Sequence, residues 1–283
     1  MPFVIPYPVI DPVLVEIGPF AVRWYALAYL CGLVFGWRYA RWLATRPPAL
    51  IRAEDVDDFL VWATLGVVLG GRIGYVLFYQ PDYFLAHPLA ALQIWKGGMA
   101  FHGGLMGVVV AAYGFCRVRR LPKAAFADPL FCAAPVGLGL GRLANFINNE
   151  LAGRPTDVPW AMVFPGWGDV PRHPSQLYQA SLEGVALFVI LFVLARRESV
   201  RCRLGLLSGV FLVGYGVFRA FAETFRQPDA VVGFIGPGLT MGQILSFPMI
   251  LIGAILIVRA LIRPPVAAPL PAAEPSPPVK TRP

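Results

Sequence analysis

The stretch that organises this chain is Gly141-Arg142-Leu143-Ala144-Asn145-Phe146-Ile147-Asn148-Asn149-Glu150-Leu151-Ala152-Gly153. It follows a long apolar run and contains one arginine, three asparagines and one glutamate. Groups of this kind cost several kcal/mol each at membrane depth unless they are paired or face water. A segment this polar at the end of an apolar helix is therefore a candidate functional site. The alternative is that it only caps a helix and turns the chain.

The composition is typical of a polytopic membrane protein. Of the 283 residues, 57% are hydrophobic and 14% are charged, whereas soluble domains carry about 25% charged residues. The four cysteines show no CxxC or Cys/His metal spacing. Because free cysteines behave as small apolar residues, we expect neither a disulfide framework nor a metal site.

Seven apolar segments come close to the length of about 20 residues that crosses a hydrocarbon core about 30 Å thick. They are expected near Trp24–Trp42, Val56–Tyr79, Gly97–Cys116, Ala124–Phe146, Gln176–Ala195, Leu204–Phe225 and Leu239–Ile262. The predicted fold class is an all-α integral membrane protein of about seven transmembrane helices. Arg72 interrupts the second segment, and Arg219 and Glu223 interrupt the sixth.

The basic residues alternate between connecting segments. Four lysines or arginines follow each of the first, third, fifth and seventh predicted spans. These four segments together hold sixteen of the 24 lysines and arginines. The positive-inside rule then predicts an outer N-terminus and a cytoplasmic C-terminus. The formal net charge of +8 therefore indicates orientation in a bilayer, and we expect no nucleic-acid partner.

This topology divides the chain into a membrane domain, residues 1–263, and a tail. Residues 80–96, with two prolines and several aromatic residues, are expected to form an interfacial arm on the outer side, and the Pro/Gly-rich residues 153–174 a small outer cap. Tryptophan and tyrosine suit the headgroup zone. The Pro/Ala-rich residues 264–283 are expected to be disordered in the cytoplasm.

The same topology gathers the polar side chains of the spans at the outer face. Arg142, Asn145 and Glu150 fall at the end of the fourth span, and Arg219 and Glu223 toward the end of the sixth. A guanidinium fork suits phosphate, so several arginines on one face indicate an anionic phospholipid headgroup or another phosphorylated amphiphile. Alternatively, Arg142 pairs with Glu150, and Arg219 with Glu223, as structural salt bridges. Arg72 and Arg154 are further arginines with the same two interpretations.

Other polar residues are less specific. His102, in Phe101-His102-Gly103-Gly104, is either a group that moves a proton near neutral pH or a satisfied histidine in tight helix packing. Tyr25 and Tyr215 suit an aromatic belt. Ser175 follows His173-Pro174 without a Gly-x-Ser-x-Gly elbow, so it is expected to be the N-cap of a helix and not a nucleophile.

Several motifs resemble those of the bacterial prolipoprotein diacylglyceryl transferases. The stretch Gly141–Gly153 matches the signature of that family at every defined position. The supporting motifs are His102-Gly103-Gly104-Leu105-Met106-Gly107, Arg23-Trp24-Tyr25, His173-Pro174-Ser175-Gln176-Leu177-Tyr178 and Glu223-Thr224-Phe225-Arg226-Gln227-Pro228-Asp229. They span nearly everything but the tail.

The resemblance implies an enzyme of the bacterial cytoplasmic (inner) membrane whose site faces the outer, periplasmic side. It implies transfer of the diacylglyceryl group of phosphatidylglycerol to the lipobox cysteine of a prolipoprotein signal peptide, with formation of a thioether and release of glycerol phosphate. No cofactor or metal is expected. The residues that it implicates in activity are Tyr25, His102, Arg142, Asn145, Glu150, Gly153, Tyr215, Arg219 and Glu223.

These residues fit the chemistry that the resemblance implies. Arg142 and Arg219 would bind phosphate and stabilise the leaving group, with Asn145 and Glu150 orienting them. His102 is the candidate base for the thiol, and a field from the arginines that lowers the pKa of the thiol is the alternative. Two other interpretations stay open: a transporter or flippase for an anionic lipid or metabolite, and an intramembrane hydrolase.

Overall fold

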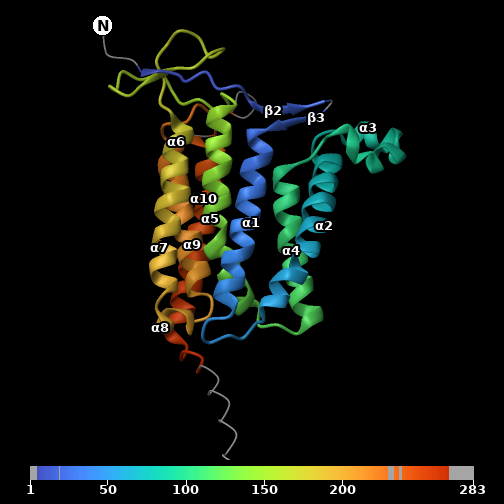
Figure 1. Cartoon of the computed structure of the whole chain (residues 1–283), viewed down its shortest axis with the longest axis vertical. Helices are drawn as coiled ribbons and strands as arrows, with labels where there is room; N and C mark the ends of the chain where they lie inside the picture. Colours follow the sequence, from blue (N-terminus) through green and yellow to red (C-terminus); the bar gives the residue numbers. More distant parts are fainter. Residues whose placement is uncertain (1–4, 19, 229–232, 236–237, 268–283) are drawn as a thin grey trace, which may run out of the picture.

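The computed structural model describes residues 5–18, 20–228, 233–235 and 238–267 as a bundle of long helices that run in alternating directions (Figure 1). These helices are α1 (Trp24–Ala44), α2 (Ala53–Phe78), α4 (Phe101–Arg119), α5 (Lys123–Ile147), the continuous helix α6 (Ser175–Gln179), η3 (Ala180–Ala186) and α7 (Leu187–Ala195), α9 (Leu206–Ala222) and α10 (Met241–Ile262). Most ends agree with the predicted spans to within a few residues. The third predicted span is an exception, because Gly97 and Gly98 adopt positive φ angles of 82° and 80° and precede the helix.

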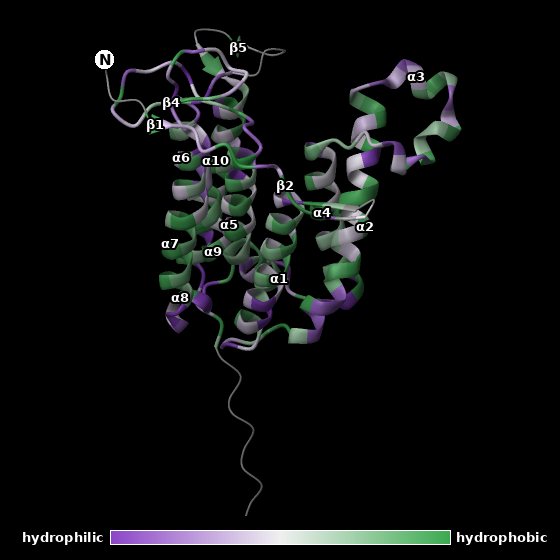
Figure 2. Cartoon of the chain, turned by 45° about the horizontal axis from the view of Figure 1, so that its top comes forward, coloured by the Kyte–Doolittle hydropathy of each residue, from purple (hydrophilic) through white to green (hydrophobic). Residues whose placement is uncertain are grey.

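Five of the described helices are long and apolar enough to cross a membrane. They are α2, α4, α5, the continuous helix Ser175–Ala195, and α10. Helix α9 is shorter, with 17 residues. Hydrophobic residues cover the sides of the bundle, and hydrophilic residues gather near the helix ends (Figure 2). The chain is therefore a multi-pass membrane protein.

Small residues bring the helix backbones close together. Helix α2 packs on α4, α1 on α5, and α9 on α10. A Cβ atom added to Gly70 of α2 would lie 2.8 Å from the Cα of Gly107 in α4, and one added to Gly209 of α9 would lie 2.8 Å from the carbonyl oxygen of Gly253 in α10. Close approach of this kind favours helix association in lipid, where the hydrophobic effect does not act between helices.

A short helical arm projects from the end of α2 (Figure 1). It consists of α3 (Pro81–Ala86), η1 (Pro88–Leu92) and η2 (Ile94–Lys96). Arg72 holds it: the side chain is buried and donates hydrogen bonds to the carbonyl oxygens of Ala90, Ala91 and Gly97 at 2.7, 2.8 and 2.6 Å. Of the two interpretations of Arg72, the structural one agrees with these contacts.

Short strand pairs lie at the same end of the bundle as the arm and add to the predicted all-α architecture. Strand β1 (Ile5–Pro6) pairs with β4 (Met162–Val163), β2 (Val13–Ile17) with β3 (Phe20–Arg23), and β5 (Phe234–Ile235) with β6 (Leu239–Thr240). Helix α8 (Glu198–Arg201) lies at the opposite end. Most of the predicted tail, residues 268–283, lies outside the described residues.

Candidate functional site

The alternating helix directions bring the predicted site residues to one end of the bundle. Helices α1, α4 and α6 begin at this end, and α5 and α9 finish there (Figure 1). Tyr25 and His102 therefore lie near helix starts, and Asn145 and Arg219 near helix ends. This grouping agrees with the prediction from the sequence that these residues lie at the same end of the helices.

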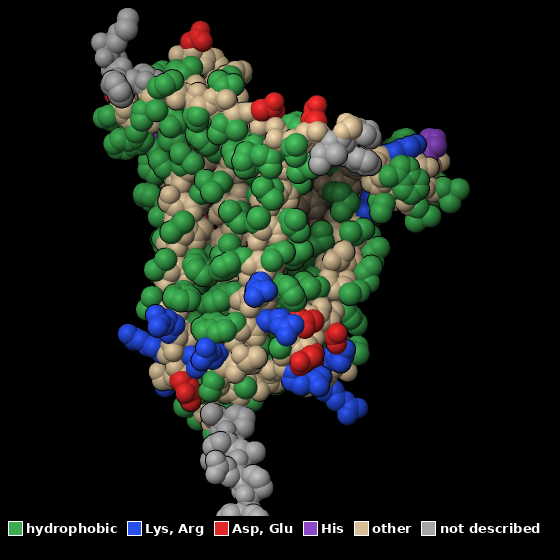
Figure 3. Space-filling view, viewed as in Figure 1, with side chains coloured by type: hydrophobic (Ala, Val, Ile, Leu, Met, Phe, Trp, Pro, Cys, Tyr) green, Lys and Arg blue, Asp and Glu red, His purple; other side chains and the backbone are tan. Residues whose placement is uncertain are grey.

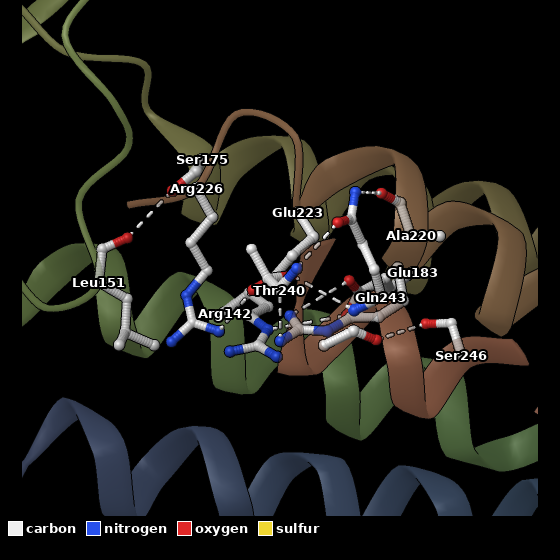
Figure 4. A network of polar contacts seen from close by, with 12 residues as sticks. Arg142, Leu151, Ser175, Glu183, Ala220, Glu223, Arg226, Thr240, Gln243 and Ser246 are labelled. Carbon is white, nitrogen blue, oxygen red and sulfur yellow. Dashed lines mark hydrogen bonds and ion pairs between the residues drawn. The ribbon is translucent and has the colours of Figure 1, made fainter. Parts of the chain in front are cut away.

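Three arginines and two glutamates form a continuous network at this end (Figure 4). Glu183 lies 3.8 Å from both Arg142 and Arg219, measured from its carboxylate oxygens to Nε of Arg142 and Nη1 of Arg219. Arg219 also forms an ion pair of 2.9 Å with Glu223, whose second oxygen lies 3.6 Å from Arg226. We call these five residues the arginine network. Its formal charge is one positive unit.

The carboxylates of the network are more deeply buried than two of its arginines. The side chains of Glu183 and Glu223 are 0% and 4% exposed, whereas those of Arg142 and Arg219 are 19% and 13% exposed. A buried charge is stable only when it is paired, so the carboxylates hold the guanidinium groups in place. The partly exposed side chains of Arg142 and Arg219 are the part of the network that an anion can approach.

Glu183 is the functional candidate that sequence reasoning missed. Its carboxylate accepts no hydrogen bond within the described part of the chain, so its contacts with both arginines are electrostatic. It lies on η3, a π-helical turn inside the helix Ser175–Ala195, and such turns are frequent at functional sites. The signal in the sequence is a single glutamate within an otherwise apolar span.

We expect Glu183→Gln to lower the rate of the reaction at this site about tenfold or more, because loss of the carboxylate charge displaces Arg142 and Arg219, and a misplacement of about 1 Å can cost about 100-fold in rate. Steady-state kinetics of the purified variant measure the effect. Glu183→Asp, which keeps the charge, should recover part of the loss. Glu198→Gln, at an exposed position on α8, is the matched control. Equal rates for Glu183→Gln and the unmodified chain would contradict a positioning role.

A second group of polar side chains continues from Arg142 along the end of α5. Arg142 donates a hydrogen bond of 3.4 Å to Oδ1 of Asn145, which donates from Nδ2 to Glu150 at 2.8 Å and to the hydroxyl of Tyr25 at 3.4 Å. Asn148 also donates to Glu150, at 3.3 Å. In the described residues Glu150 thus binds amides and does not pair with Arg142, which was one of the sequence-based alternatives. The other, the pair of Arg219 with Glu223, is present.

Gly153 lies where three segments meet. Its N–H donates to the carbonyl oxygen of His173 at 3.0 Å, and it forms an isolated antiparallel bridge with Arg226. A Cβ atom at this position would lie 2.7 Å from the Cβ of His173 and 2.8 Å from the carbonyl oxygen of Phe225. The absence of a side chain therefore lets residues 153–174 dock against the end of α9.

Two neighbours of Gly153 also have structural contacts. Arg154 donates from Nε to the carbonyl oxygen of Arg226 at 2.9 Å, so its contacts favour the structural interpretation over phosphate binding. Burial lowers the pKa of His173, which favours the neutral imidazole near pH 7. Its Nδ1 lies 3.1 Å from the hydroxyl of Tyr178.

The prediction that Ser175 is the N-cap of a helix is wrong. Pro174 occupies that position, and α6 begins at Ser175. The serine hydroxyl is buried and donates to the carbonyl oxygen of Leu151 at 3.0 Å. Proline has no N–H and a fixed φ, which lets it precede the helix directly.

We expect Ser175→Ala to retain activity, because the change removes one hydrogen bond, a loss of about 1 kcal/mol. The melting temperature should fall slightly while the turnover of the folded protein stays the same. Complete loss of activity in a folded Ser175→Ala variant would instead identify the serine as a nucleophile and favour the hydrolase interpretation.

Of the two remaining candidates, Tyr215 lies close to the arginine network and His102 does not contact it. The phenol of Tyr215 interacts with Glu183, Arg219 and Arg142, so it belongs to the surroundings of the network. His102 is exposed and makes a ring contact with Phe101. Within the described residues it has no hydrogen bond or ion pair with the network.

Known proteins are similar to this sequence over almost its whole length. A family model described as prolipoprotein diacylglyceryl transferase matches residues 12–259. The phosphatidylglycerol–prolipoprotein diacylglyceryl transferase of Paramagnetospirillum magneticum is 56% identical over 269 residues, which cover 95% of this chain and all of the relative. The protein of the same name from Rhodospirillum rubrum is 58% identical over 272 residues, which cover 95% and 99%.

Proposed function

Because the chain belongs to the prolipoprotein diacylglyceryl transferase family, we propose that its arginine network binds the phosphate of phosphatidylglycerol. The chain is a phosphatidylglycerol–prolipoprotein diacylglyceryl transferase: it transfers the diacylglyceryl group of the lipid to prolipoproteins. The observation that carries the assignment of the site is the pair of partly exposed arginine side chains, Arg142 and Arg219, which both form an ion pair with the buried Glu183.

The acceptor in this proposal is the thiol of a lipobox cysteine. The thiolate attacks the glyceryl carbon that carries the phosphate ester, so a carbon–sulfur bond forms as the carbon–oxygen bond breaks. Glycerol phosphate leaves with the electron pair, and its developing charge is stabilised by Arg142 and Arg219. Asn145 orients Arg142 through its hydrogen bond to the guanidinium, and Glu150 and Tyr25 hold the amide of Asn145 in turn.

Two features of the chain favour loss of the proton from the thiol in this scheme. A free cysteine has a pKa of about 8.5, and the positive charge of the arginine network lowers the pKa of a thiol placed beside it. His102, exposed at the same end of the bundle, accepts the proton. Ion pairs hold Arg142 and Arg219 in the network, whereas His102 has no hydrogen bond or ion pair with the network within the described residues. The proposal therefore relies mainly on the positive charge of the arginines.

We propose that residues 1–263 form the membrane catalytic domain, with seven spans, an outer N-terminus and a cytoplasmic C-terminus. The protein then lies in the bacterial inner membrane with the network facing the periplasm, and the arm 80–96 and the cap 153–174 lie on that side. Lysine and arginine side chains gather at the opposite end of the face in Figure 3, the end of α8. The positive-inside rule supports this orientation.

Labelling of single cysteines tests the orientation. In a chain whose four native cysteines are replaced by alanine, Asp169→Cys should react with a membrane-impermeant maleimide in intact spheroplasts. Arg117→Cys should react only after lysis. Both positions are exposed, so accessibility to the reagent depends on the side of the membrane. The reverse pattern would overturn the proposed topology.

Mass spectrometry tests the lipobox acceptor and the transfer. The purified protein is incubated with isotopically labelled phosphatidylglycerol and a peptide that contains a lipobox cysteine. The peptide should gain the mass of one diacylglyceryl group while glycerol phosphate is released, and a peptide with serine in place of cysteine should not. Movement of labelled lipid across vesicles without modification of the peptide would favour a transporter instead.

A further inference from the structure

A hollow lies between α1 and α2 at the end of the bundle opposite the arginine network. Trp37, Arg38, Arg41 and Trp42 of α1 line it, together with Thr45 at the C-cap of α1 and Ala53 at the start of α2, and they surround a volume of about 390 Å³. Clefts that hold small molecules are of about 300–1,000 Å³. No residue of the arginine network contributes to the hollow, so it is a separate site.

Hydrogen bonds to one carboxylate fix two walls of the hollow. Asp57 accepts from Nε1 of Trp37 at 2.6 Å and from Nη1 of Arg41 at 2.5 Å. The guanidinium of Arg46 lies over the ring of Trp42, 4.6 Å from its centroid. The indole rings and Arg41 are thus held in place before any ligand binds, which reduces the entropy lost on binding.

Arg38 gives the hollow its charge. The side chain is exposed, and within the described part of the chain it has no ion pair and no hydrogen bond. Asp57 balances Arg41, and the neighbouring Asp55 and Asp58 pair with Arg52 and Arg119 outside the hollow. The charge of Arg38 therefore remains available to an anion.

An apolar surface continues from the hollow toward the middle of the bundle. Val34 lies one helical turn from Arg38, and Leu33 and Leu30 follow on the same side of α1; their exposed fractions are 44%, 57% and 57%. A soluble anion would make no favourable contact with such an apolar surface, whereas the acyl chains of a lipid would cover it. Tryptophan side chains at the edge of this surface suit the headgroup zone.

We propose that this hollow binds an anionic phospholipid of the leaflet opposite the active site, with its phosphate on Arg38 and Arg41 and its acyl chains along α1. Basic pockets between transmembrane helices bind anionic lipid headgroups in this way. The proposal goes beyond the transfer reaction and does not depend on which end of the bundle faces the periplasm. It assigns to the chain a second, non-substrate lipid site.

Photolabelling with peptide mapping tests the proposal. The full chain is reconstituted in phosphatidylcholine nanodiscs that contain a little phosphatidylglycerol with a photoreactive headgroup. Labels should appear within residues 37–53 as well as around the arginine network. Arg38→Gln should reduce the label in residues 37–53 about fivefold, because one basic residue near the surface contributes about 1 kcal/mol. Labelling around the network should not change.

Matched controls separate this site from general attraction to basic residues. Arg117→Gln removes an exposed arginine at the same end of the bundle and should leave the label in residues 37–53 intact. Photoreactive phosphatidylcholine should label this segment weakly. Three results would overturn the proposal: equal labelling of residues 37–53 by the two lipids, unchanged labelling of this segment in Arg38→Gln, or an equal loss of its label in Arg117→Gln. Displacement by soluble glycerol phosphate would identify a free-anion site instead.

Discussion

Arg142→Ala is expected to lower kcat/KM for diacylglyceryl transfer by a factor of about 100 to 1,000, the usual effect of removing one group that stabilises developing charge. Arg219→Ala should have an effect of the same size. Both side chains are partly exposed and form an ion pair with the buried Glu183, so each substitution leaves the departing phosphate with one cation fewer. Kinetics with phosphatidylglycerol and a lipobox peptide measure the change.

The conservative variant and a control make this result specific. Arg142→Lys should recover only part of the activity, because an ammonium group cannot bind a phosphate and Asn145 with a planar fork. Lys96→Ala removes an exposed cation at the same end of the bundle and should leave the kinetics unchanged. If Arg142→Ala and Arg219→Ala both kept full turnover, the arginine network would not be the phosphate site.

Gly153→Ala is expected to lower both the stability and the activity strongly. The added methyl group would meet the Cβ of His173 and the backbone oxygen of Phe225 at 2.7 and 2.8 Å, and backbone atoms cannot move aside as a flexible side chain does. Overpacking of this kind costs about 1–3 kcal/mol. The shift would also move Arg226, which bridges to Gly153. Thermal unfolding in detergent and transfer assays on the same preparation measure the two effects.

Gly141→Ala is the control for this second prediction. Gly141 opens the same signature stretch and lies inside α5, but a Cβ atom there would meet no heavy atom within 4 Å beyond its chain neighbours and the backbone of its own helix. Alanine favours a helix over glycine by about 1 kcal/mol, so this variant should be as stable as the unmodified chain or slightly more stable. Equal damage from the two substitutions would show that contacts at Gly153 do not explain its effect.

The positions of the long helices were predictable because apolar length is a strong signal. Each span needs about 20 apolar residues, and the described helices begin and end close to the predicted ones. Once the helices alternate in direction, residues near the starts of odd-numbered spans and near the ends of even-numbered spans must share one end of the bundle. Arg142, Arg219 and Asn145 were therefore grouped correctly from the sequence.

Partners across the bundle were harder to predict. Glu183 lies on a different helix from the arginines that it contacts, and no spacing rule relates them. The spacing of four residues on a helix supported the pair of Arg219 with Glu223. The alternative that Arg142 pairs with Glu150 was wrong, because the chain turns after α5 and brings Glu150 to the amide of Asn145. Strands of two residues, such as β4, carry too few residues for a pattern.

The π-helical turn at residues 180–186 has a consequence for chain length. A π turn holds one residue more than an α-helical turn, so the segments on its two sides are out of phase with an uninterrupted α-helix. Deleting one residue there would restore the ordinary register and rotate Ser175–Gln179 by about 100° relative to α7. The orientation of Glu183 toward Arg142 and Arg219 would be lost, although every side chain involved would still be present. Insertions and deletions between residues 175 and 195 should therefore be tolerated less well than substitutions at most single positions in that helix.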